Sequence, residues 1–393
     1  MTVLRSRVEH PGVWTADPGF GVYVHIPFCL HRCHYCDFNT YTDQGELHDA
    51  YIDALVRHVD DVARSGAHRT ATSVFFGGGT PTVLPVGSLA RVLGAVREAI
   101  GVAGDAEVTV EVNPETVDRR SFDELLGAGF NRVSIGVQSL VSPVLAGLGR
   151  THSPQRALDA IADARRAGVD NINADLIYGS PWESTREWET TLDRIVDAGV
   201  DHISAYALTV EQGTPLATLV ATNRAPDVNP DVQADRHAMA EEILGAAGFN
   251  RYEVSNWSVP GRESRHNVLY WCAGDYAGLG AGAHAHDCGR RSWSVRLPRD
   301  FIARVRSGRS VEAGHEVLSA AERVGEALML GLRLTNGIEV AAFERRFGSG
   351  ALGTRAEALS SLQAGGLIEC DRRRIRVAPA ATLLGNEIGS RLL

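Results

Sequence analysis

The sequence predicts an α/β fold with a mostly parallel sheet, followed by a small α+β domain. Up to about residue 210, six short apolar segments alternate with segments of helical periodicity. From residue 316 the pattern changes to helices followed by a hairpin. Regular β-α alternation is typical of parallel sheets with helices outside, and right-handed crossovers can roll such a sheet into a barrel.

Each element has its own local signal. A capping-box pattern, Ser121 with Glu124, marks the start of the third helix, and Gly129 and Gly168 end two helices. The alternation fades before the length of about 250 residues that a full eight-unit barrel needs, so spacing alone leaves a partial barrel and an open sheet as alternatives. The expected strands are 21–26, 73–76, 107–112, 132–137, 171–177 and 202–208, and the expected helices are 45–64, 88–100, 121–129, 154–167 and 184–198.

Polar residues recur where these strands end. A cysteine loop follows the first strand and the turn Gly77-Gly78-Gly79-Thr80-Pro81 follows the second, while Glu111, Gln138 and Asp175 stand at or near the ends of the next three. Reactive groups of such folds gather at the carboxyl ends of the strands, so we expect all of them at one mouth.

Three cysteines with the spacing Cys-x3-Cys-x2-Cys, Cys29, Cys33 and Cys36, are the strongest chemical signal. A [4Fe–4S] cluster normally takes four thiolates, so three leave one iron with an open position for chemistry. A zinc site completed by His31 or His34 is weaker, because no second ligand pair stands at a recognisable spacing. Three buried structural thiols are the remaining alternative.

The glycine turn has two interpretations. A run of glycines lets backbone groups approach a ligand, but it is also an ordinary strand-to-helix turn. It is not a phosphate-binding P-loop, since no Gly-Lys-Ser/Thr follows, and its contiguous glycines do not match a dinucleotide fingerprint.

Composition narrows the class of protein. The net charge of −9 and the absence of a basic stripe argue against a nucleic-acid binder. We find no long apolar run for a membrane span and no apolar core of a signal peptide at the N-terminus. The six cysteines fit a reducing cytosol, so a cytoplasmic location is expected.

Four parts are expected along the chain. Residues 1–20 are expected to form a loosely held leader, 21–260 the partial barrel, 261–315 a connecting segment with a His-Asn-x-x-Tyr-Trp motif, and 316–393 a winged-helix-like accessory domain. Residues 290–298 look like a connector. For the last domain, protein docking or a lid role is favoured over DNA binding, because the chain is acidic.

The cysteine spacing resembles that of radical S-adenosylmethionine (SAM) proteins. The residues around it, His25-Ile26-Pro27-Phe28 and Tyr35-Cys36-Asp37-Phe38, resemble the oxygen-independent coproporphyrinogen III oxidase family. Within that family the resemblance is closest to the HemW-type haem chaperones. The resemblance covers nearly the whole chain. It implies an open six-unit (β/α) barrel with a C-terminal accessory domain and a [4Fe–4S] cluster on Cys29, Cys33 and Cys36. It also implies SAM contacts from Tyr23, Tyr35, Gly78, Gly79, Thr80, Glu111, Gln138, Arg150, Asp175 and Ala207. A solvated surface arginine is the alternative interpretation of Arg150, but its place after Leu148-Gly149, downstream of Gln138, favours the family role.

Two departures separate the chain from the decarboxylating oxidases. Phe38 stands where the oxidase carries a fourth cysteine, and only 28 residues precede Cys29, where the oxidase has a longer extension. The motif that begins at His266 resembles the haem chaperones and implies haem contact by His266, Tyr270 and Trp271, with His266 as a ligand of the haem iron. His25, His284 and His286 are interpreted as structural.

The resemblance therefore implies a haem chaperone that delivers haem b to respiratory haem proteins, with a flavodoxin or ferredoxin as reductant, a homodimer and peripheral membrane association. No residue is assigned a catalytic role, and the sequence leaves open whether SAM is cleaved. One alternative is an enzyme that converts coproporphyrinogen III to protoporphyrinogen IX by radical SAM decarboxylation. The other is a regulator whose C-terminal domain touches nucleic acid.

Overall fold

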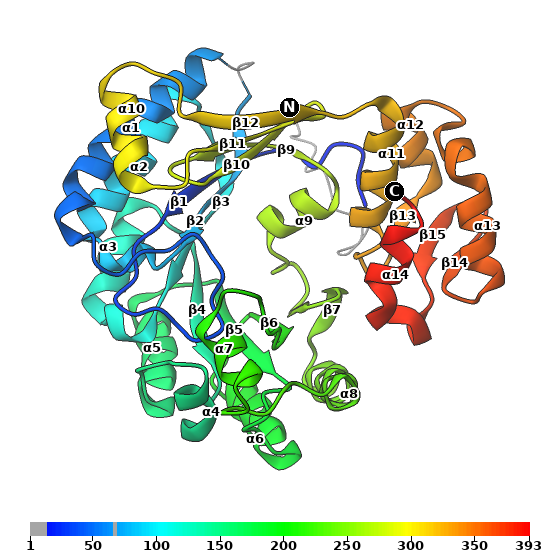
Figure 1. The fold of residues 1–393 in the computed structure, drawn as a ribbon, viewed down its shortest axis with the longest axis horizontal. Coiled ribbons are helices and arrows are strands. Elements are labelled where there is room, and N and C mark those ends of the chain that lie inside the picture. The colour runs from blue at the N-terminus through cyan, green and yellow to red at the C-terminus, as the bar shows by residue number, and fades with distance from the viewer. Residues whose placement is uncertain (1–13, 66–68) are drawn as a thin grey trace, which may run out of the picture.

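Six parallel strands form the centre of the fold. The structure, a computed structural model, describes residues 14–65 and 69–393. Neighbours in the chain are neighbours in the sheet, and each pair is parallel, as predicted (Figure 1). These strands are β1 (Phe20–Ile26), β2 (Ala71–Gly78), β3 (Val102–Val112), β4 (Arg132–Gln138), β5 (Ile172–Tyr178) and β6 (His202–Ala207).

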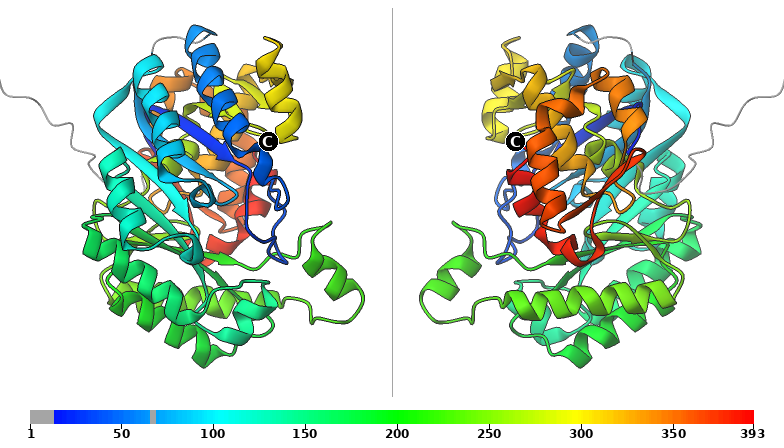
Figure 2. Two further views of the ribbon diagram at one scale, coloured as in Figure 1. Left: turned by 90° about the vertical axis from the view of Figure 1, so that its left-hand side faces the viewer. Right: turned by 90° about the vertical axis from the view of Figure 1, so that its right-hand side faces the viewer.

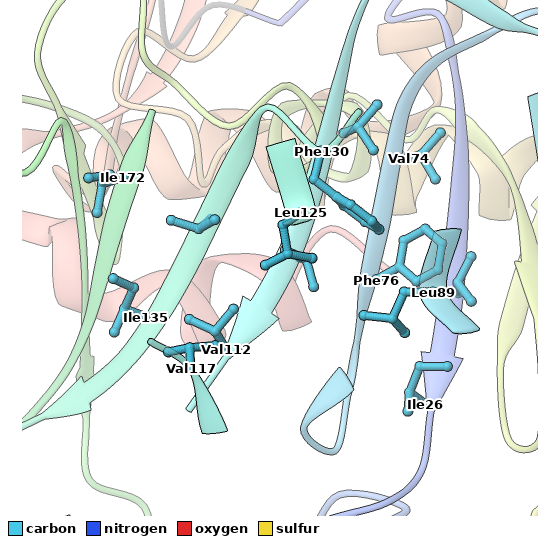
Figure 3. Packing of buried hydrophobic residues seen from close by; sticks show 14 of the residues in the cluster. Ile26, Val74, Phe76, Leu89, Val112, Val117, Leu125, Phe130, Ile135 and Ile172 are labelled. Atoms are coloured by element: carbon cyan, nitrogen blue, oxygen red, sulfur yellow. The ribbon is translucent and has the colours of Figure 1, made fainter. Parts of the chain in front are cut away.

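Helices cover the outer face of this curved sheet (Figures 1 and 2). Figure 3 shows the layer between them, where Val74 and Phe76 of β2 pack near Leu89 and Phe130. The expected partial barrel of six β/α units is confirmed. The covering helices are α1 (His48–Ser65), α2 (Val86–Ala99), α3 (Arg119–Ala128), α5 (Pro154–Ala167) and α6 (Thr185–Asp197), with 3-10 turns η1 (Gly45–Leu47), η2 (Pro81–Val83) and η3 (Pro114–Thr116). The short helix α4 (Ser142–Gly147) lies instead beside the cysteine loop, where its Gly147 carbonyl is hydrogen-bonded to the His34 ring.

The start of α3 differs from the prediction. Asp118, not Ser121, is the N-cap residue: its carboxylate accepts a hydrogen bond from the Ser121 backbone N–H at 2.8 Å. Ser121 is the third helical residue and completes the capping box from inside the helix, and Glu124 instead pairs with Arg120 on the surface. Asp is as good an N-cap as Ser, and the N-cap of α3 lies three residues before the predicted one.

The sheet continues at both edges beyond the six units. On one side β7 (Asn250–Glu253) and β8 (Asn256–Ser258) form a hairpin on β6. On the other side β9 (Asp275–Leu279) pairs in parallel with β1, and antiparallel strands β10 (His284–Asp287), β11 (Arg290–Ser294) and β12 (Glu312–Val317) follow.

The part of 261–315 after the His-Asn-x-x-Tyr-Trp motif, expected to be a connecting segment, instead forms strands and a helix. Residues 290–298 were expected to be a connector because they are polar and basic, yet most of them form β11. An antiparallel edge can keep one face in water, so its strands do not need apolar residues on both sides. The remaining helices of the barrel part are α7 (Pro215–Ala221), α8 (Pro230–Ala246), α9 (Arg265–Trp271) and α10 (Pro298–Arg306).

The C-terminal part is an α+β unit, as predicted, and has its own apolar core. It lies beside α9, on the side of the sheet opposite the covering helices (Figure 1). Its helices are α11 (Ala320–Gly331), α12 (Val340–Phe347), α13 (Ala356–Ala364) and α14 (Gly385–Ser390), with turns η4 (Ala351–Arg355) and η5 (Pro379–Leu384) and strands in the order β13 (Ile338–Glu339), β15 (Arg374–Val377) and β14 (Ile368–Cys370).

The predicted loose leader is wrong for the residues that the structure describes; residues 1–13 lie outside them. Trp14 is 1% exposed and packs on Phe343 of α12 with ring centroids 5.3 Å apart. Its backbone N–H donates to the Gly337 carbonyl at 3.0 Å. A large aromatic side chain gains more from burial than the short segment loses on ordering. Among the described helices, none is both long and apolar enough to cross a bilayer.

The corrected cap can be tested with two substitutions. Asp118→Ala removes the acceptor of the Ser121 N–H and is expected to lower the free energy of unfolding by about 1 kcal/mol. Glu124→Ala removes only an exposed ion pair and is expected to change it by less than about 0.5 kcal/mol. Urea denaturation of both variants measures this. If the two substitutions lower the free energy of unfolding equally, or if Glu124→Ala lowers it more, the predicted capping box of Ser121 and Glu124 would be supported instead.

Candidate functional site

The polar residues predicted at the strand ends do converge on one cavity. It has a volume of about 380 Å³ and opens where the carboxyl ends of β2 to β6 meet the cysteine loop. All of the predicted cluster and SAM residues except Tyr23 line it: Cys29, Cys33, Cys36, Tyr35, Gly78, Gly79, Thr80, Glu111, Gln138, Arg150, Asp175 and Ala207.

The cysteine loop is held by its own backbone and by the barrel. The Cys29 backbone N–H donates to the Tyr41 carbonyl at 3.0 Å. The Thr80 hydroxyl donates to the Cys29 sulfur at 3.7 Å, and an Arg150 guanidinium N–H to the Cys33 sulfur at 3.4 Å. Burial raises the pKa of Cys29 to about 11. Its thiol therefore stays protonated until a metal takes the place of the proton.

The zinc interpretation of the cysteine loop can be compared with the arrangement of possible ligand atoms. A single zinc ion brings its thiolates within about 4 Å of one another, because each Zn–S bond is about 2.3 Å long. In residues 14–65 and 69–393, the one group of three possible ligand atoms that lie within 4.8 Å of one another is Asp275, Asp287 and Cys288. The cysteine loop, with its two histidines, is not such a group, so the described structure does not preform a mononuclear zinc site there.

The glycine turn presses directly on the cysteine loop. The backbone N–H groups of Gly79 and Thr80 donate to the carbonyls of Ile26 and Phe28, each at 2.8 Å. Gly78 has φ of +107°, and a Cβ on Gly79 would lie 2.6 Å from the Phe28 carbonyl oxygen. Only glycine allows this close approach. The turn thus fixes the loop as well as lining the cavity, which an ordinary surface turn does not do.

Two carboxylic acids lie together in the cavity wall. Asp175 accepts hydrogen bonds from the Ser134 hydroxyl at 2.9 Å and the Asn173 amide at 2.8 Å. Glu111 accepts one from the Gly78 N–H at 3.1 Å. Burial, and then the charge of Asp175, raise the pKa of Glu111 to about 8. A positively charged ligand beside these groups would return Glu111 to its ionised form. SAM, a sulfonium with an ammonium group, fits this requirement.

Arg150 is not a surface residue. Its guanidinium donates to the Asn113 side-chain oxygen at 2.9 Å and the Gly136 carbonyl at 3.0 Å, besides Cys33. Gln138 lies at a bulge that ends β4 and has φ of 64°, an uncommon backbone conformation for a residue other than glycine. Such strain is typical of functional sites.

The sequence prediction missed Asn113, Ser134 and Tyr206, which also line the cavity. Asn113 directly follows β3, so the rule that found Glu111 would have found it. Ser134 lies within β4, where no sequence signal marks it. Tyr23 was predicted here but lines a second, neighbouring cavity, and its hydroxyl is hydrogen-bonded to the His25 ring at 3.0 Å.

The motif that begins at His266 forms α9 and is mostly buried. His266 is 1% exposed, and its ring nitrogens are hydrogen-bonded to the Ser73 hydroxyl and to the Tyr270 hydroxyl, each at 2.9 Å. Ligation of haem iron by His266 stays a prediction. It would require one of the two ring nitrogens to give up its hydrogen bond. Trp271 points to the C-terminal unit, under the Arg333 guanidinium at 4.3 Å. Of the three predicted haem contacts, Tyr270 lines the second cavity.

The three histidines that were interpreted as structural differ in how many hydrogen bonds their rings form. His25 is buried, with its second ring nitrogen 3.0 Å from the Asn39 carbonyl oxygen, so its structural interpretation is confirmed. His286 is hydrogen-bonded to the Gly274 carbonyl at 3.1 Å. His284 is exposed and lines the second cavity.

Comparisons with known proteins agree with this site. The model of the Radical SAM superfamily matches residues 23–195, and that of the HemN C-terminal domain matches residues 318–384. The protein named "Heme chaperone HemW" of Mycobacterium tuberculosis is 41% identical over 398 residues, covering 100% of both chains. The chain belongs to the HemW family. The HemW of Escherichia coli is 37% identical over 81% of this chain and 83% of its own.

A solved structure shows the same fold. Coproporphyrinogen III oxidase (HemN) of Escherichia coli, described as a radical SAM enzyme, superposes with a TM-score of 0.83 over 96% of this chain and 91% of its own, at 23% identity. Membership of the radical SAM superfamily implies a [4Fe–4S] cluster and SAM, and the cysteine loop and the acidic cavity wall fit both.

The glycine turn provides a first test. Gly79→Ala forces its Cβ against the carbonyls of Phe28 and Ile26, so we expect SAM affinity of the cluster-reconstituted protein to fall at least about tenfold. Gly87→Ala in α2 is the matched control, since a Cβ there meets nothing within 4 Å. Calorimetric titration with SAM measures both. If Gly79→Ala binds SAM as tightly as the wild type, the glycine turn is not part of the SAM-binding site.

Glu111 provides a test by pH. Its folded pKa is raised above the unfolded value, so its contribution to stability is fully present below about pH 4.5 and is lost as pH rises toward about 8. The melting temperature of the apoprotein should therefore fall more steeply between pH 5 and 8 in the wild type than in Glu111→Gln. SAM should reduce this difference. Parallel melting curves for the two proteins would show that Glu111 does not titrate in this range.

Proposed function

We propose that this protein is a haem chaperone, which binds haem and delivers it to respiratory haem proteins, on a barrel that carries a [4Fe–4S] cluster and SAM. The observation that carries the proposal is full-length similarity at 41% identity to relatives named haem chaperones, together with an intact cluster and SAM cavity. A relative from Bacillus subtilis, at 32% identity over 93% of this chain, carries the same name.

The residues of the cavity have separate tasks in this proposal. Cys29, Cys33 and Cys36 would hold the cluster, and the turn at Gly78 and Gly79 would present backbone groups to SAM. When bound, cluster and SAM supply one-electron chemistry. Glu111 and Asp175 supply negative charge for a cationic ligand; their neighbours Ser134 and Asn173 keep Asp175 oriented. Arg150 ties the Cys33 thiol to β4, so cluster and SAM sites move as one body.

The alternative is coproporphyrinogen III oxidation, which the fold alone also allows. Phe38 argues against it. This side chain stands where the resemblance places a fourth cysteine in the oxidases, and it is 64% exposed at the mouth of the cavity. An exposed aromatic ring provides an apolar surface for a planar ligand, which suits haem binding.

Further elements belong to the same proposal. The protein works in the cytosol, which fits its free cysteines. A flavodoxin or ferredoxin reduces the cluster, and haem transfer occurs from a homodimer at the membrane surface. The C-terminal unit is a docking or lid domain rather than a nucleic-acid binder, since the chain carries a net charge of −9.

Anaerobic haem titration of the cluster-reconstituted protein tests this function. We expect stoichiometric haem binding, transfer of haem to an apo-cytochrome b faster than from haem-loaded albumin, and no protoporphyrinogen IX when coproporphyrinogen III, SAM and reductant are supplied to the same sample. Protoporphyrinogen formation with indifferent haem binding would overturn the proposal and establish the oxidase. The triple variant Cys29→Ser, Cys33→Ser, Cys36→Ser separates the contribution of the cluster from that of the barrel.

A further inference from the structure

A second cavity of about 640 Å³ lies next to the SAM cavity, between the barrel and the added strands β9 to β11. It shares Phe38, Gly78 and Glu111 with the SAM cavity. Its volume is within the range of about 300–1,000 Å³ typical of cofactor sites. Its wall is rich in aromatic side chains, which are Tyr23, Phe38, Tyr270, Tyr276 and Trp293.

The aromatic rings are fixed by one another. Tyr270 and Tyr276 meet edge to face with ring centroids 4.7 Å apart. Trp293 on β11 pairs across the strands with His284 on β10, and the two rings stack with centroids 5.9 Å apart. Rings of this kind offer flat faces and broad apolar contact at little loss of side-chain entropy. The wall therefore suits a planar aromatic ligand.

His284 is the one available imidazole of this cavity. The other histidine in its wall, His25, has both ring nitrogens hydrogen-bonded, to Tyr23 and Asn39. Among the residues that the structure describes, none is hydrogen-bonded to a His284 ring nitrogen. The part of the His284 ring that faces the cavity loses contact with water, and the guanidinium groups of Arg291 and Arg296 are nearby; both lower the pKa of His284, which favours the neutral form that ligates metals.

Arg296 adds a cation at the rim. Its backbone carbonyl accepts hydrogen bonds from Asn39 and Tyr41, which fixes the residue against the cavity. Its guanidinium forms no ion pair with any acidic side chain of the described residues, whereas Arg290 and Arg291 on β11 are paired with Glu312 and with Glu316 and Glu326. An unpaired guanidinium at the edge of an apolar cavity suits a carboxylate of the ligand.

We propose that this second cavity holds the haem cargo, with His284 as ligand of its iron, Trp293 and Tyr276 against its faces and Arg296 beside its propionates. The inference rests on the proposed function and assigns the haem site within it. It replaces the structural interpretation of His284. It gives His266 a positioning role, because His266 holds the Tyr270 hydroxyl at the cavity wall.

The test uses the full chain with two ligands, ferric haem and metal-free protoporphyrin IX. His284→Ala should weaken haem binding at least tenfold and protoporphyrin IX binding less than twofold, because only haem offers iron to the imidazole. It should also lose the imidazole-ligated absorption and paramagnetic-resonance signals of haem, and added imidazole should restore them. Arg296→Gln should weaken both ligands, since both carry propionates.

Controls separate the outcomes. His315→Ala on β12 changes an exposed ring that is hydrogen-bonded to Glu312 and does not line the cavity, so it should bind haem like the wild type. Retained cluster absorbance and SAM binding show that each variant is folded, and His284→Met should replace the imidazole signals with those of a thioether ligand. Unchanged haem affinity and spectra in His284→Ala, with both lost in His266→Ala, would overturn this inference and leave the chaperone function standing. Absence of haem binding by the wild type would overturn the proposed function itself.

Discussion

Parallel pairing of β1 to β6 is the constraint on which the site depends. Because each strand enters from the same side, every loop that follows a strand lies at one edge of the sheet, and residues more than 150 positions apart share one cavity. The cysteine loop follows β1, the glycine turn β2, and Glu111 lies at the end of β3. Two backbone hydrogen bonds, from Gly79 and Thr80 of the glycine turn to the carbonyls of Ile26 and Phe28, hold the turn against the cysteine loop.

Helix α9 is the second organising element, and it explains the His-Asn-x-x-Tyr-Trp motif in physical terms. Glu107 of β3 accepts hydrogen bonds from the backbone N–H groups of Arg265 and His266, which places a carboxylate at the helix N-terminus. His266 joins the helix to Ser73 of β2. At the other end, Cys272 is buried in the core of the C-terminal unit. The motif therefore has a structural role of its own, since it connects the sheet to the C-terminal unit.

The sequence was sufficient for the features that local signals encode. Apolar periodicity gave the β/α units, and glycine in the left-handed region gave the ends of α3 and α5. It failed where tertiary contacts decide. The edge strands from β10 to β12 are polar and have no period that separates them from a loop. The buried state of Trp14 depends on Phe343, more than 300 residues later. His284, interpreted from the sequence as structural, lies on β10 in the wall of a cavity to which the added strands contribute, and no local sequence signal marks that position.

The two cavities are electrostatically connected. Glu111 and Gly78 line both, and the Glu111 carboxyl is neutral or charged according to what lies beside it. A cationic ligand in the first cavity favours the ionised carboxylate. An ionised Glu111 in turn makes the second cavity less favourable for the carboxylate groups of a ligand and more favourable for a cationic iron centre. For the haem proposed in the second cavity, an orientation with the propionates toward Arg296 and away from Glu111 would satisfy both charges.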